Sequence, residues 1–483
     1  MLSVGKGEKM EKIRKKASIS PYLLVILSFL VVIIVGSFLL VTPFAQANGK
    51  WAFNTIADDG TRVTYLDCLF TAVSATCVTG LCTFHSGIGN TLSFTGQLIV
   101  LVMIQIGGLG FITVLTFIFT LFRRKLQFKN RFFLSQALNA TNFADVIIFV
   151  RRIIIISFVA ETIGFLIGLP VAFTLYENNI GKALWSSLFT SVSAFNNAGF
   201  DIFGSDSLIA DAGTIMGNLK AVDTWAYYYY LCYIMLLVVV GGISFMVIIE
   251  VLSFKKTPRQ YSAFTKIVLT TTLSLLVFGS VMFYLTEHVI NGAENFTTFD
   301  AIFQSVTCRT AGFASYDQSR LTTSGKTISC FLMFIGGSPL STAGGIKTTT
   351  FFIVVLAMIS HLRGKRVVAF NRAYNSNTVL KGMTLMVIAF IGCMIAFVGV
   401  SAFEKGNPQI TMDMVFFETF SAFGTVGLSA NTTPLLSDGS KIILCFLMFL
   451  GRLGPMTFFQ IFKNTIEDTT GHFEYVEADF LVG

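Results

Sequence analysis

Charged residues are scarce in this sequence. Only 12% of its 483 residues are Asp, Glu, Lys or Arg, whereas 54% are hydrophobic and the mean hydropathy is +0.73. A soluble domain of this length needs a far more polar surface, so the composition excludes a soluble protein and is typical of one embedded in a bilayer. The net charge of +8 does not indicate a nucleic-acid partner, because the basic residues gather between apolar segments.

Histidines and paired cysteines are also scarce. The four histidines lie far apart, and the eight cysteines form no CxxC pair. They assemble no local metal site and no histidine-based catalytic site, so we expect the cysteines to be small apolar residues of membrane helices. The sequence has no P-loop and no dinucleotide fingerprint after a strand, which predicts no organic cofactor on this chain. We do not expect an enzyme.

Long apolar runs are abundant instead. A membrane helix needs roughly 20 residues to cross about 30 Å of hydrocarbon, and eight runs are near or above this length: 21–42, 95–122, 152–176, 226–252, 265–286, 327–359, 378–402 and 440–462. The first run follows a basic segment, so a cleaved signal peptide is an alternative. Because the run is long and lacks a convincing small-residue cleavage site, we predict a retained span.

The distribution of charge predicts the orientation of these spans. Basic residues gather in the N-terminal segment and in every second loop, around residues 123–131, 255–259 and 363–372, whereas the alternate loops are rich in Asp and Glu. By the positive-inside rule, the basic loops and both termini are cytoplasmic in a multi-pass plasma-membrane protein. The acidic outer loops would concentrate cations at that face.

One short pattern occurs four times between the spans. It reads VSATCVTG at 73–80, VSAFNNAG at 192–199, SVTCRTAG at 305–312 and FSAFGTVG at 420–427, so that the final glycines are 119, 113 and 115 residues apart (199 − 80, 312 − 199 and 427 − 312). The segments before the glycines, 67–76, 184–195, 300–308 and 411–423, are too short to cross a bilayer. We interpret them as re-entrant pore helices.

The repeat predicts the fold class. We expect an all-α membrane protein of four units, each with a span, a pore helix and a second span, in parallel orientation around one pseudo-fourfold pore. The predicted boundaries are a cytoplasmic N-terminus at 1–20, repeats at 21–125, 146–254, 262–362 and 376–466, and a cytoplasmic tail at 467–483. Parallel repetition places the four glycine turns around one axis, where backbone carbonyls replace the water of a dehydrating cation. Glycine permits the positive φ and the close approach that this requires.

The second spans contain a further repeat. Three of them carry a glycine pair, at Gly107, Gly241 and Gly336 and the residue after each, whereas the fourth has Arg452 after Gly451. A cation in mid-span usually faces a polar interior, so Arg452 is a functional candidate, with snorkelling to an interface as the alternative. The third unit is broken by the glycine-rich segment Gly336–Thr350, which suits a gate below the filter and is otherwise a simple kink.

These residues resemble the Trk/Ktr/HKT superfamily of potassium transporters, and within it the membrane subunits of bacterial Ktr systems. The resemblance covers nearly the whole chain and depends on the combination of SAFNNAGF, RTAGF, STAGGIKT and GRLGP. It implies potassium bound at filter carbonyls, an intramembrane gating loop and a positive barrier at Arg452. The implied filter residues are Cys77, Val78, Thr79, Gly80, Asn196, Asn197, Ala198, Gly199, Arg309, Thr310, Ala311, Gly312, Gly424, Thr425, Val426 and Gly427, and the implied gate residues are Gly336, Gly337, Ser338, Pro339, Gly344, Gly345, Lys347 and Arg452.

The resemblance also implies a homodimer with one pore per subunit, contact with membrane lipid, and a cytoplasmic nucleotide-binding regulatory ring of the KtrA or RCK type. Glycine in all four copies resembles the potassium-selective members, since serine in the first copy accompanies sodium permeation in plant relatives. The third copy departs from the pattern with Val306 and Thr307 where the others have Ser-Ala. Sodium-coupled uptake stays open beside passive flux.

Two other functions were weighed. A secondary symporter commonly has inverted repeats, whereas these four units share one orientation. A membrane-embedded enzyme would need a nucleophile or metal ligand near the few membrane-depth acids, Asp67, Glu161 and Glu418, and no such residue stands at a useful spacing. Both are therefore weaker interpretations than a cation pore.

Overall fold

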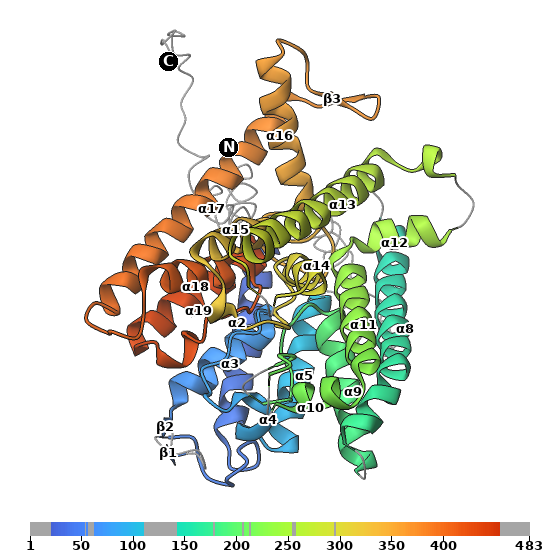
Figure 1. Ribbon diagram of the computed structural model, residues 1–483. Helices are drawn as coiled ribbons and strands as arrows, with labels where there is room; N and C mark the ends of the chain where they lie inside the picture. Colours follow the sequence, from blue (N-terminus) through green and yellow to red (C-terminus); the bar gives the residue numbers. More distant parts are fainter. Residues whose placement is uncertain are drawn as a thin grey trace, which may run out of the picture.

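The computed structural model describes residues 21–454 except for 54, 57–61, 111–142, 177–178, 205–206, 212–213, 254–256 and 294–295. These residues are mostly helical, as the predicted fold class requires (Figure 1). The predicted terminal segments 1–20 and 467–483 and the ends of two predicted spans, 111–122 and 455–462, lie outside them.

Four long helices correspond to the predicted first span of each unit. They are α2 (Pro21–Val41), α8 (Phe143–Leu175), α13 (Ala263–Phe283), which continues as the π-helix η2 (Tyr284–Ile290), and α17 (Ser376–Phe403). Among the described residues, Ile148–Leu175, Thr224–Gly242, Ala263–Ile290 and Ser376–Phe403 are long and apolar enough to cross a membrane. Their outward residues are exposed Leu, Ile, Val and Phe, which is expected of surfaces that face lipid.

A short helix lies at each of the four predicted pore-helix segments: α3 (Tyr65–Cys77), α9 (Ile180–Phe195), α14 (Thr298–Thr307) and α18 (Met412–Gly424). Two of them begin with a reciprocal capping box, Thr64 with Asp67 and Thr297 with Asp300, which satisfies backbone N–H groups that the helix itself leaves free. All four end a few residues before a repeat glycine, because the chain must leave helical geometry to reach it.

The predicted second spans at 226–252 and 327–359 are each broken into two helices, whereas the ends of those at 95–122 and 440–462 lie outside the described residues. The second spans comprise α5 (Phe94–Leu109), α11 (Thr224–Gly242) with α12 (Phe245–Leu252), α15 (Thr323–Phe334) with α16 (Thr348–Leu362), and α19 (Asp438–Leu453). The sequence predicts the break between α15 and α16 but not the one at Ile243 and Ser244. There, the freed carbonyls of Gly241 and Gly242 accept hydrogen bonds from the loop between α15 and α16.

The units pack in a closed cycle. Each second span packs against the short helix of the next unit, α5 on α9, α11 on α14, α15 on α18 and α19 on α3, and in Figure 1 the units follow one another in sequence order around the centre. Two ion pairs reinforce this order, because Lys326 on α15 contacts Asp413 at 2.8 Å and Lys441 on α19 contacts Asp67 at 2.8 Å, the second pair being buried. The contact between α19 and α3 joins the last unit to the first.

The remaining elements are small and belong to the segments that connect these helices along the chain. They are α4 (Gly87–Thr91), α10 (Ile215–Val222), the 3₁₀ turns η1 (Pro258–Gln260), η3 (Gln318–Arg320) and η4 (Thr433–Leu435), and the antiparallel pairs β1 (Thr55–Ile56) with β2 (Arg62–Val63) and β3 (Val368–Ala369) with β4 (Arg372–Ala373). All eight cysteines are free thiols and most are buried, which agrees with their predicted role as apolar residues.

Candidate functional site

The four repeat glycines meet at one point. An added Cβ on Gly80 would lie 2.5 Å from the carbonyl oxygen of Ala198, and one on Gly199 would lie 2.7 Å from that of Ala311. In the same way, Gly312 faces the carbonyl of Val426, and Gly427 faces that of Thr79. The glycines and the carbonyl oxygens before them therefore form a closed ring, with one member from each unit.

The backbone around this ring is unusual in the same way four times. The glycines have φ values of +102°, +71°, +80° and +93°, and the residues two positions before them, Val78, Asn197, Thr310 and Thr425, have φ values of +58°, +58°, +68° and +50°. The left-handed region is costly for a β-branched side chain, on the order of 1–3 kcal/mol. Such a conformation persists only where the surroundings fix it.

Buried hydroxyl groups provide part of this support. The N–H of Gly80 donates to Ser74 Oγ at 3.0 Å, and the N–H of Gly427 donates to Ser421 Oγ at 3.2 Å. In the second unit, Ser193 Oγ donates instead to the carbonyl of the residue after the glycine, at 2.5 Å. The hydroxyl of the repeated Ser-Ala pair thus joins the end of each of these short helices to the glycine segment.

The third copy makes a similar contact from a different position. Val306 stands where the others have serine, and Thr307 Oγ1, one residue later, donates to the carbonyl of Phe313 at 2.6 Å. The backbone differs locally, because the N–H of Ala311 bonds to the carbonyl four residues earlier, whereas that of Ala198 bonds five residues earlier. The sequence departure therefore changes the hydrogen bonding behind the ring while Gly312 stays in the ring.

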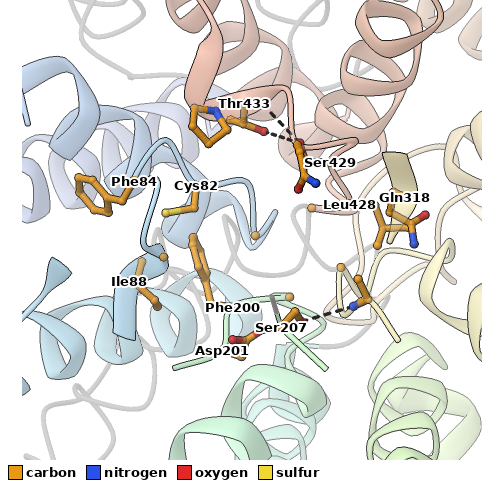
Figure 2. Close-up of a pocket in the computed structure, with 18 of the residues that line it drawn as sticks. Cys82, Phe84, Ile88, Phe200, Asp201, Ser207, Gln318, Leu428, Ser429 and Thr433 are labelled. Atoms are coloured by element: carbon orange, nitrogen blue, oxygen red, sulfur yellow. Dashed lines mark hydrogen bonds between the residues drawn. The ribbon is translucent and has the colours of Figure 1, made fainter. Parts of the chain in front are cut away.

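A cavity of about 370 Å³ opens above the ring, and all four repeat glycines line it. Figure 2 shows side chains from all four units around this cavity, including Cys82, Asp201, Gln318 and Ser429. Its described lining contains two carboxylates, Asp201 and Asp317, and neither lysine nor arginine. Arg320 forms ion pairs with Asp317 at 3.3 Å and with Asp211 at 2.7 Å, and the hydrogen bond to Asp211 raises the pKa of the guanidinium. The three carboxylates Asp201, Asp211 and Asp317 outnumber this one guanidinium. The potential at the mouth of the cavity thus favours cations.

The predicted gate residues other than Arg452 lie together on the other side of the ring, in the loop between α15 and α16, and Arg452 contacts this loop from α19. Ile335 and Ile346 form a bridge that closes the loop at its base. Thr342 donates from its N–H and its hydroxyl to the carbonyl of Gly241, at 3.3 and 2.9 Å, so the loop is held against the end of α11. An added Cβ on Gly344 would clash with Thr425, which places the loop in direct contact with the glycine segment of the fourth unit.

Two basic side chains, Arg452 and Lys347, contact this loop. Arg452 donates through Nη1 to the carbonyl of Thr342 in the loop and through Nη2 to those of Gly107 and Gly108 at the end of α5. Lys347 Nζ donates to the carbonyl of Ala343 at 2.7 Å. Within the described part of the chain, neither side chain forms an ion pair with a carboxylate. Arg452 therefore bridges the loop and α5 as a cation without an acidic partner.

The side chains behind the ring differ between units. The predicted filter residues three positions before the glycines are Cys77, Asn196, Arg309 and Gly424. Arg309 is buried and donates to the carbonyls of Thr272 and Gly336, both at 3.2 Å. The ring is thus built from backbone, whereas the side chains behind it contact other helices.

Comparisons with known proteins agree with this architecture. The model of the TrkH family, described as cation transport proteins, matches residues 37–468. The chain belongs to the TrkH family. It is 33% identical to the potassium/sodium uptake protein NtpJ of Enterococcus hirae over 98% of this chain and 99% of that protein, and 33% identical to the Ktr system potassium uptake protein B of Bacillus subtilis over 94% and 96%. The resemblance inferred from the four motifs is therefore confirmed.

A solved structure agrees at the level of the fold. The crystal structure of the potassium transporter TrkH from Vibrio parahaemolyticus is similar with a TM-score of 0.66 and 16% identity, covering 93% of this chain and 86% of that one. The TrkH family consists of membrane transport proteins and not of enzymes, as predicted.

Sequence reasoning missed the ion pairs that join the units of this TrkH-family chain. Lys326 and Lys441 each stand 14 residues after a repeat glycine (326 − 312 and 441 − 427), and Asp67 and Asp413 stand 13 and 14 residues before one (80 − 67 and 427 − 413). Aligning the four copies beyond the glycine motif would have shown both lysines at one position and the two aspartates one residue apart. The pairing itself needs the cyclic packing, because each lysine contacts the aspartate of the next unit.

Proposed function

We propose that this chain is the potassium-translocating membrane subunit of a Ktr/Trk-type uptake system. The relatives named above are uptake proteins for potassium, or for potassium and sodium. The observation that carries the proposal is the closed ring of Gly80, Gly199, Gly312 and Gly427 with the carbonyl before each glycine. Four inward backbone carbonyls replace the hydration shell of a monovalent cation without any charged ligand.

The proposed path runs from the acidic cavity through the ring to the loop between α15 and α16. We propose that Cys77–Gly80, Asn196–Gly199, Arg309–Gly312 and Gly424–Gly427 form the selectivity filter. Irregular backbone at membrane depth is tolerated where it lines such a path. The αL residues before the glycines support this assignment, because a strained conformation repeated in four different sequences requires a common purpose.

The gate in this proposal is the loop that contains Gly336, Gly337, Ser338, Pro339, Gly344, Gly345 and Lys347, together with Arg452. A loop rich in glycine can change conformation at low cost. Arg452 adds an electrostatic barrier, since a unit charge about 4 Å away costs a passing cation about 4 kcal/mol at an effective dielectric near 20. Because Arg452 donates a hydrogen bond to the loop, the steric barrier of the loop and the electrostatic barrier of Arg452 would move together.

The topology proposed is four parallel units with eight spans in the plasma membrane and both termini in the cytoplasm. The cyclic packing of second spans on short helices supports it, as does the basic charge of alternate loops. We further propose a homodimer and a cytoplasmic nucleotide-binding ring of the KtrA or RCK type as regulator. We also propose that the flux depends on sodium, because the relative NtpJ is described as a potassium/sodium uptake protein.

Rubidium uptake tests the proposal. The full chain is purified, reconstituted into potassium-loaded proteoliposomes, and supplied with labelled Rb⁺ while external K⁺ or Na⁺ is varied. We expect saturable Rb⁺ uptake that K⁺ inhibits far more effectively than Na⁺. Uptake no faster than in empty vesicles would refute the function, and equal inhibition by both ions would refute the potassium filter.

A further inference from the structure

A buried carboxylate lies directly behind the glycine segment of the second unit. Glu161 on α8 is 5% exposed, and its Oε1 accepts hydrogen bonds from Gln105 Nε2 at 2.9 Å and from Asn196 Nδ2 at 3.1 Å. Its Oε2 accepts from Gln105 Nε2 at 3.2 Å. Gln105 belongs to α5 of the first unit and Asn196 to the end of α9. The carboxylate therefore joins three helices from two units.

Asn196 carries this contact to the ring. Its amide Nδ2 also donates to Gln105 Oε1 and to the carbonyl of Val192, both at 2.9 Å. Its Oδ1 packs so closely on α5 that a Cβ added to Gly108 would overlap it. Asn196 is the last residue before the αL residue Asn197, and the next residue, Ala198, supplies the ring carbonyl. A shift of Asn196 is thus passed on to that carbonyl after only two residues.

The space beside these groups is mainly apolar. On the outer side of Glu161 and Gln105 lies a cavity of about 270 Å³, whose walls are otherwise mainly Leu, Val and Phe from α5, α8 and α9. A water molecule needs several polar partners to remain in such a space. Among the described residues, Glu161 forms no ion pair, so its partners are neutral amides. In the other units, the position of Asn196 is occupied by Cys77, Arg309 and Gly424, and among the described residues none of these bonds to a carboxylate.

We propose that Glu161 is a positioning residue that fixes the filter carbonyl of the second unit through Asn196 and thereby sets the discrimination between potassium and sodium. This inference rests on the proposed function. In the snug-fit account of filter selectivity, a carbonyl ring selects the larger ion while its oxygens are held apart, because a relaxed ring can close on the smaller one. Three helices holding one amide restrict that movement at the second unit.

Substitution of Glu161 separates this role from a general structural one. Glu161→Leu removes both acceptor oxygens, whereas Glu161→Gln keeps one and turns the other into a donor that faces the Gln105 amide. The matched control is Thr162→Val, one residue along α8, where the threonine hydroxyl bonds only to its own helix, at the carbonyl of Phe158. Each variant is reconstituted as the full chain, its folding is checked by thermal unfolding in detergent, and inhibition of Rb⁺ uptake by K⁺ and by Na⁺ is measured.

We expect the ratio of the two inhibition constants to fall about five- to tenfold in Glu161→Leu, the effect of losing one buried hydrogen bond of about 1–1.4 kcal/mol. Glu161→Gln should give a smaller fall in the same direction, and Thr162→Val should keep the wild-type ratio. A lower maximal rate with an unchanged ratio in both Glu161 variants would overturn the inference and leave Glu161 a structural residue. If Glu161→Leu does not fold, Glu161→Gln decides alone. Absence of potassium-selective uptake by the wild type would instead refute the proposed function.

Discussion

Replacing Gly80 by serine is the sharpest test of the proposed filter. The residue has φ = +102°, where any side chain is strained, and a Cβ there would lie 2.5 Å from the carbonyl oxygen of Ala198. Contacts of a Cβ under 3.0 Å essentially never occur, so this carbonyl must move by about 0.5 Å (3.0 − 2.5). The change therefore acts on a ring oxygen itself and not on a distant support.

The size of the effect follows from the strain. A non-glycine residue in a sparsely populated backbone region costs on the order of 1–3 kcal/mol, and each 1.4 kcal/mol changes a binding constant tenfold. If the ring relaxes to relieve this strain, we expect the free energy of potassium binding to weaken by a comparable amount. We expect the half-saturating K⁺ concentration to rise roughly tenfold, and Na⁺ to become a correspondingly better competitor.

Competition assays in proteoliposomes measure both quantities, with Rb⁺ as tracer and K⁺ or Na⁺ as competitor. Gly49→Ser is the matched control, because Gly49 also has a positive φ of +65° but has no atom within 4 Å of an added Cβ. It carries similar backbone strain far from the ring. Ion competition that is unchanged in Gly80→Ser, or changed equally in Gly49→Ser, would refute the reasoning.

Three further predictions concern the gate and the contact between units. Arg452→Ala should raise the maximal Rb⁺ flux by removing a fixed positive charge, while Arg452→Lys keeps the charge and most of the restriction; complete loss of transport in both folded variants would make Arg452 a structural anchor. Deletion of Gly344–Lys347 should also raise flux but preserve the K⁺/Na⁺ competition, and a changed ion preference would contradict a gate separate from the filter. Lys441→Met should destabilise the chain by about 3–5 kcal/mol in thermal unfolding, because it leaves the buried Asp67 carboxylate unpaired. Adding Asp67→Asn should restore much of that loss, and purely additive losses would argue against the pairing.

The helices could be predicted from the sequence because hydropathy and length determine them. The expected first spans at 152–176 and 378–402 end within one residue of α8 and α17, at Leu175 and Phe403, but α8 begins at Phe143, nine residues before the expected start (152 − 143). The short segments before the glycines are helical where the repeat placed them. The break in the third unit followed from its glycine and proline content, since such residues cannot continue a helix.

Contacts between helices could not be predicted in the same way. The break after Gly242 depends on a loop about 100 residues later, in which the N–H groups of Ser338 and Thr342 donate to the freed carbonyls of Gly242 and Gly241. The cluster of Gln105, Glu161 and Asn196 joins three segments that no periodicity brings together. Hydropathy predicts which residues are buried, whereas these contacts depend on which buried polar groups form hydrogen bonds with one another.

In the proposed pore, unequal side chains behind an equal backbone would let each unit of one chain take a different role. A homotetramer would repeat any filter support or gate residue four times, and four copies of Arg452 would place four charges around one path. In a single chain, the loop belongs to the third unit, Arg452 to the fourth, and the Glu161 cluster joins the first and second. Arg309 connects the third glycine segment to Gly336 at the start of that loop. Because carbonyl ligands need only backbone, the ring tolerates this divergence, and each unit is free to specialise behind it.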